Sequence, residues 1–161
     1  MKQRSTEIEI LSHIFENHCN YGELLSSEKR QELLDKLQVE GYSRDKVAKA
    51  FTWLTTLATQ QKAKKNRPRK NSIRIFSPDE VNKLGDEALT FIKTLEFVGV
   101  LNTRTKEILI NQLMQLEQNY IGILDVKWVT FIILVSELEK KQNVGKKVEL
   151  FSLILNDEHI C

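Results

Sequence analysis

The sequence predicts an all-α protein, built from an N-terminal three-helix unit and a C-terminal helical bundle that a basic linker joins. Apolar residues recur at three- and four-residue intervals through most of the 161 residues. Helix-capping residues precede several of these runs. One strongly basic stretch without large apolar side chains, at residues 62–71, separates two sets of such runs. The predicted divisions are therefore residues 1–60, 61–72 and 73–161.

Three amphipathic helices are expected in the N-terminal unit. The first covers about residues 6–18 and the second about 27–38, with Ser27 as its N-cap. The third covers about 43–58, with Ser43 as its N-cap. Gly41 lies in the turn between the last two helices, where glycine can adopt a positive φ. Two helices joined by such a short turn have the outline of a helix-turn-helix.

The C-terminal bundle is expected to begin after a short extended segment at residues 73–76, where apolar and other side chains alternate. The sequence Ser77-Pro78-Asp79-Glu80 then supplies an N-cap, a proline at the first helical position and a capping glutamate. This helix should end near Gly99, and Asn102 should cap the next one. A last short helix is predicted within residues 143–155.

The most apolar part of the chain, Ile121 to Val135, has eleven apolar residues in fifteen. Its β-branched residues would suit a buried strand, but the pattern is longer than most strands, so we predict a helix at the centre of the bundle. Trp128 is expected in its core. Asp125 is interpreted as a first-turn acid that stabilises the helix N-terminus, rather than as a buried acid-base group.

Positive charge is concentrated in one segment. The net charge is +2, yet residues 62–71 carry six cations and no acid. Proline and the lack of large apolar residues favour an exposed tether, whereas the cations leave open an alternative as a nucleic-acid arm. In that alternative the helix at 43–58 also contributes, and the contacting residues are Arg44, Lys49, Lys62, Lys64, Lys65, Arg67, Arg69 and Lys70.

No catalytic, cofactor or metal site is predicted. The sequence lacks the glycine-rich phosphate loops, the nucleophile elbow and the H-E-x-x-H motif, and it contains six glycines. His13 and His18 are five residues apart, one more than the helical spacing that would share a metal ion. A second possible ligand set lies near the two chain ends: His18, Cys19, His159 and Cys161. It would require the two ends to meet, and neighbouring residues such as His18 and Cys19 rarely both bind one tetrahedral zinc ion.

A cytoplasmic location is expected. The sequence starts MKQRSTEIEI, without the apolar region of a signal peptide, and its two cysteines lie 142 positions apart. The apolar run at 121–135 contains two charges and is too short to span a bilayer. Membrane attachment is therefore not predicted.

Several motifs together resemble the bacterial Smg protein family. They are "RIFSPDE", "FIKTLEFVGVLNTRTKEILINQL", "LDVKWVTFIILV" and, nearer the N-terminus, "EGYSRDKVAKAFTWL". The sequence departs from the family pattern at Gly122 and Leu124, where acidic residues are usual, and in its more basic linker. The resemblance implies a small, mostly helical bacterial cytoplasmic protein of unestablished function, and it supplies no catalytic motif.

From these observations we expect a non-enzymatic helical binding or adaptor protein that acts through macromolecular contacts. Another protein is the expected partner, nucleic acid is the alternative, and no small-molecule substrate is identified. An adaptor should leave an apolar patch exposed after its helices pack.

Overall fold

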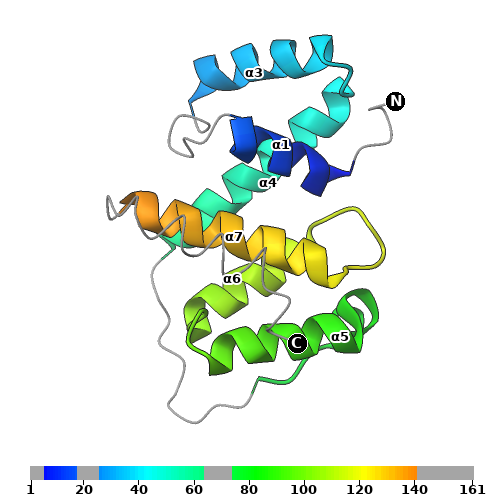
Figure 1. The fold of residues 1–161 in the computed structure, drawn as a ribbon, viewed down its shortest axis with the longest axis vertical. Helices are drawn as coiled ribbons and strands as arrows, with labels where there is room; N and C mark the ends of the chain where they lie inside the picture. Colours follow the sequence, from blue (N-terminus) through cyan, green and yellow to red (C-terminus); the bar gives the residue numbers. More distant parts are fainter. Residues whose placement is uncertain (1–5, 18–25, 64–73, 141–161) are drawn as a thin grey trace.

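A computed structural model describes residues 6–17, 26–63 and 74–140 of the chain. The described residues form helices and no strands, which confirms the all-α prediction (Figure 1). In chain order the helices are α1 (Glu7–Asn17), α3 (Ser27–Val39), α4 (Arg44–Lys62), α5 (Pro78–Phe97), α6 (Thr103–Met114) and α7 (Ile123–Lys140). The helix predicted within 143–155 lies outside the described residues.

The segment that precedes α5 is not a strand. Residues 74–77 pair with no other backbone segment, and Ile73, the first residue of the predicted extended piece, lies outside the described residues. Arg74 instead holds this segment to the helix that follows, because its guanidinium donates to both carboxylate oxygens of Glu80 at 2.8 Å. Its Nε also donates to Glu107 of α6 at 2.6 Å.

The N-cap of α3 is Ser26, so the prediction of Ser27 was wrong by one residue. Ser26 has extended backbone angles, φ −76° and ψ 140°, and its hydroxyl accepts from the amide of Lys29 at 3.3 Å. Ser27 is already helical. Either of two adjacent serines can cap a helix, and the sequence alone did not separate them.

Most other predicted helix ends are confirmed. Ser77 and Glu80 form the capping box of α5, and Asn102 caps α6 together with Thr105. Gly41 and Gly99 both have positive φ, at 101° and 85°. Ser43 occupies the N-cap of α4, although its side chain makes no capping hydrogen bond.

A kink within α5 was not predicted. Gly85 has φ 70° and ψ 171°, a conformation that is rare for any residue with a side chain. The ring of Tyr120 lies close by, since a Cβ at position 85 would be 3.3 Å from its Cε2. The amide of Ile121 donates to the carbonyl of Lys83 at 2.9 Å, which fastens the segment before α7 to the kinked turn.

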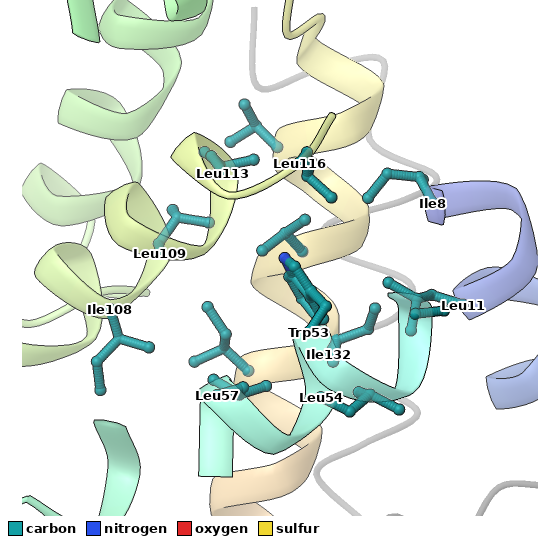
Figure 2. Packing of buried hydrophobic residues seen from close by; sticks show 14 of the residues in the cluster. Ile8, Leu11, Trp53, Leu54, Leu57, Ile108, Leu109, Leu113, Leu116 and Ile132 are labelled. Atoms are coloured by element: carbon teal, nitrogen blue, oxygen red, sulfur yellow. The ribbon is translucent and has the colours of Figure 1, made fainter. Parts of the chain in front are cut away.

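Helices α4, α6 and α7 are the centre of the fold, and α6 contacts α4, α5 and α7. α4 contacts α1, α3 and α6, whereas α7 contacts α1, α5 and α6. Figure 2 shows apolar side chains of α1, α4, α6 and α7 meeting in one cluster around Trp53. The Ile121–Val135 run is therefore the predicted helix, and it lies at the predicted central place.

A buried polar contact also links α4 to α6. The indole nitrogen of Trp53 donates to the carbonyl of Gln112 at 2.9 Å, and the Gln112 amide donates back to the Trp53 carbonyl at 3.1 Å. Both side chains are buried. The helices on either side of the basic segment thus share apolar and polar contacts, while the predicted domain boundaries stay a prediction.

Trp128 is not a core residue, contrary to the prediction. It is half-buried on α7 and packs against the edge of the core, with its ring 6.0 Å from that of Phe131 in an edge-to-face arrangement. The tryptophan at the centre of the core is Trp53, which is 3% exposed. The apolar run at residues 121–135 predicts a buried helix, but a helix that is apolar on most sides does not show which side faces its neighbours.

Candidate functional site

The predicted nucleic-acid residues are only partly described. Arg44 and Lys49 are exposed on α4, as expected, and Lys62 is its last residue. Lys49 forms an ion pair with Glu117, and this hydrogen bond raises the pKa of the Lys49 ammonium. A carboxylate beside this cation offsets the charge that a phosphate would contact. The remaining residues lie outside the described part: Lys64, Lys65, Arg67, Arg69 and Lys70.

The threonines of the exposed α4 surface bond to their own helix. The hydroxyls of Thr52, Thr55 and Thr56 each donate to the carbonyl four residues earlier, at 3.0 to 3.1 Å. Thr55 also accepts from the guanidinium of Arg30 on α3 at 2.6 Å. This surface of α4 therefore offers few free donors for base edges or phosphates.

No candidate metal centre occurs within residues 6–17, 26–63 and 74–140, where no three His, Cys, Asp or Glu side chains come together. Four of the residues considered from the sequence lie outside these ranges: His18, Cys19, His159 and Cys161. His13 is described, and its Nε2 is 2.8 Å from a carboxylate oxygen of Glu40. This contact joins α1 to the turn between α3 and α4.

A groove between α1 and the start of α7 is the candidate site. Its volume is about 560 Å³. In Figure 1 the two helices lie next to each other, and their N-terminal ends point to the same side of the molecule. The lining residues are Thr6, Ile8, Glu9, Ser12, His13, Gln118, Leu124, Asp125 and Trp128.

Apolar side chains supply the contact area of the groove. Ile8 is buried at its base, and Trp128 is half-buried beside it. Leu124 is 63% exposed although it lies in the first turn of α7, the most apolar of the described helices. A large aliphatic side chain left in water next to a partly exposed indole is a surface that a partner can cover.

On the α1 side the carboxylate is Glu9, which is held by the cap of that helix. The Thr6 hydroxyl accepts from the Glu9 amide at 3.2 Å, and the Glu9 carboxylate accepts from the Thr6 amide at 3.1 Å. This reciprocal pair is a capping box. It fixes the Glu9 carboxylate at the rim of the groove while leaving the residue exposed.

On the α7 side the corresponding carboxylate is Asp125. It accepts from the amide of Gly122 at 2.9 Å and from the side-chain amide of Gln118 at 2.8 Å. The interpretation of Asp125 as a first-turn acid is thus confirmed. Because negative charge is favoured at a helix N-terminus, Asp125 stabilises the start of α7.

A buried carboxylate directly precedes the groove residue Ile8 in the chain. Glu7 is 9% exposed and has one carboxylate oxygen with no hydrogen-bond partner. Burial, followed by the nearby Glu117 carboxylate, raises the pKa of Glu7. Lys49 and Lys83 partly oppose this shift. Burial also lowers the pKa of Lys83, whose ammonium donates to the Met114 carbonyl at 2.8 Å.

The sequence did not predict this groove. Its residues come from α1, from the segment before α7 and from α7, and no local pattern shows that these segments meet. The departures from the pattern of the resembled family at Gly122 and Leu124 fall at this groove, although no site was predicted from them. Of these two positions, Leu124 lines the groove and Gly122 donates to the Asp125 carboxylate.

Comparison with known proteins gives relatives along most of the chain. The family described as "Protein of unknown function (DUF494)" matches residues 8–158. "Protein Smg homolog" of Coxiella burnetii (strain Dugway 5J108-111) is 32% identical over 157 residues, which covers 98% of this chain and 96% of that protein. "Protein Smg homolog" of Shewanella baltica (strain OS155) is 36% identical over 130 residues, with coverages of 78% and 82%. No solved structure matches the chain.

A helix that crosses a bilayer must be both long and apolar. None of the helices that the structure describes has both the length and the apolar character needed to cross a membrane. The long apolar run of α7 is interrupted by Asp125 and Lys127.

Proposed function

We propose that this protein is a non-enzymatic adaptor that binds another protein through the groove between α1 and α7. The chain belongs to the DUF494 family of proteins of unknown function. The observation that carries the proposal is the exposure of Leu124, at 63%, beside the half-buried Trp128. Aromatic and aliphatic side chains of this kind commonly form the centre of protein interfaces.

The polar groups of the groove support binding rather than catalysis. Glu9 and Asp125 are each engaged in capping a helix, and His13 is engaged with Glu40. A general base must instead be within hydrogen-bond reach of the proton that it abstracts. These three side chains hold helices in place, so the groove has a rigid frame on which a partner can dock.

Nucleic acid remains the alternative partner, through the cations of residues 62–70 and the exposed surface of α4. Lys49 supports it weakly because Glu117 already neutralises its charge. A cytoplasmic location remains part of the proposal, and cell fractionation would test it.

The experiment is a capture from bacterial lysate with the purified full-length protein as bait, with and without nuclease. The test variant is Leu124→Ser, and the matched control is Val39→Ser on α3, since Val39 is 88% exposed and lies outside the groove. We expect a protein that the wild type and the control retain, that Leu124→Ser loses, and that nuclease leaves in place. Capture that nuclease abolishes would favour the alternative, and capture that Leu124→Ser leaves intact would place the interface elsewhere.

A further inference from the structure

The charge of the groove indicates what kind of segment it accepts. Among the residues that the structure describes, the lining contains two carboxylates, Glu9 and Asp125, and no lysine or arginine. Lys127, on the same helix as Asp125, has its ammonium 5.8 Å from the centre of the Phe91 ring of α5. The imidazole Nε2 of His13 lies 2.8 Å from a carboxylate oxygen of Glu40. The described part of the groove rim is therefore acidic.

Neither carboxylate can easily move away from the groove. Each is the third helical residue of its helix and accepts hydrogen bonds at that helix N-terminus. A partner thus meets two fixed negative charges beside an apolar surface, without the entropic cost of ordering two mobile side chains. Fixed charges of this kind favour complementary partners and disfavour partners of like charge.

We propose that the groove binds a cationic amphipathic segment of a partner protein. One or more large apolar side chains of that segment cover Leu124 and Trp128, and its lysine or arginine side chains approach Glu9 and Asp125. A cation that passes over the indole of Trp128 would gain a further cation–π attraction. This inference rests on the proposed function and adds the chemistry of the partner to it.

The same charges disfavour two other occupants. The phosphates of a nucleic acid would meet the rim carboxylates and be repelled. An apolar segment with acidic flanks would bury its area against Leu124 but would place like charges together. The peptide selection below would detect the acidic segment, and the nuclease treatment of the lysate capture would detect the nucleic acid.

A random library of 12-residue peptides displayed on phage tests the inference on the immobilised full-length protein. Phage that also bind the Leu124→Ser variant are removed, so that groove binders remain. We expect the selected peptides to be enriched, relative to the starting library, in both large apolar residues and lysine or arginine. Their synthetic forms should change the tryptophan fluorescence of the wild-type protein, since Trp128 lines the groove.

The charge variant for these peptides is Glu9→Gln with Asp125→Asn, because both amides still accept the capping hydrogen bonds. We expect it to weaken peptide binding about tenfold at low salt, and by less at high salt, where charges are screened. The control is Glu28→Gln with Asp35→Asn on α3, which removes the same charge outside the groove and should leave affinity unchanged. Should the double variant unfold, Glu9→Gln alone changes an exposed residue and serves instead.

Selected peptides without basic enrichment, or affinity that the charge variant leaves unchanged, would overturn the inference. A selection that yields no groove binder would do the same. None of these results would refute the proposed function, which fails if lysate capture is independent of Leu124 or is abolished by nuclease. The two claims can therefore fail separately.

Discussion

At the scale of single residues, Glu7 is the clearest case of a side chain that costs stability. Its carboxylate is buried, one oxygen lacks a partner, and its pKa is raised above the ordinary value of 4.5. Glu7→Gln removes the buried charge and keeps an oxygen that can accept from the Glu117 amide. We therefore expect the variant to have a higher melting temperature than the wild type at pH 8.

The sign of the pH dependence follows from the raised pKa of Glu7. Above that pKa both the folded and the unfolded protein carry the charge, and the folded state bears the full cost. As the pH falls, the folded state takes up the proton first, so the cost is relieved by about pH 4.5. The advantage of Glu7→Gln should shrink over this range in thermal scans; an advantage that grows at acidic pH would contradict the assignment.

The two tryptophans should differ in their contribution to stability. Trp53→Ala removes a buried indole and its hydrogen bond to the Gln112 carbonyl, so we expect a loss of about 3–5 kcal/mol. Trp128→Ala removes a half-buried ring from the groove and should cost about 1–2 kcal/mol. Urea titrations give both values. Equal losses, or a larger loss at Trp128, would mean that the core is centred on α7 near that residue.

At the scale of the helix, the kink of α5 depends on one glycine. Gly85→Ala forces a side chain into a backbone conformation that is nearly restricted to glycine, and its Cβ would lie 3.3 Å from Tyr120. We expect a loss of about 1–3 kcal/mol in unfolding free energy. The control is Glu87→Ala, at an exposed position of the same helix, which should change stability by less than about 0.5 kcal/mol. A neutral Gly85→Ala would show that α5 can straighten.

The helices could be predicted because each depends on a local pattern, whereas the groove does not. The Ser77–Glu80 capping box and the apolar spacing of α7 are visible in neighbouring residues, and the structure confirms both. Ser26 and Ser27 are chemically equivalent caps, so the choice between them could not be made locally. The kink at Gly85 lies against Tyr120, 35 positions later, and the groove depends on α1 meeting α7. Both features depend on packing between segments that are far apart in the sequence.

At the scale of the whole molecule, the described helices should unfold together. Opening the contact between α4 and α6 would expose the buried apolar side chains around Trp53 and would leave Gln112 without its partners. A unit of about 60 residues alone buries too little surface to be more than marginally stable. We therefore expect one cooperative transition, even though the sequence suggests two units separated by a basic linker.

The two tryptophans allow this to be tested, since Trp53 lies on α4 and Trp128 on α7, on opposite sides of the basic segment. Trp128→Phe leaves Trp53 as the single fluorophore, and Trp53→Phe leaves Trp128. In each variant the urea midpoint from fluorescence should coincide with the midpoint from far-UV circular dichroism, because a two-state transition gives the same midpoint with every probe. If the fluorescence of one tryptophan changes at a lower urea concentration than the helical signal, the two halves are separately stable. Coincident midpoints would mean that a partner bound in the groove between α1 and α7 stabilises both halves at once, because that groove is built from one helix of each.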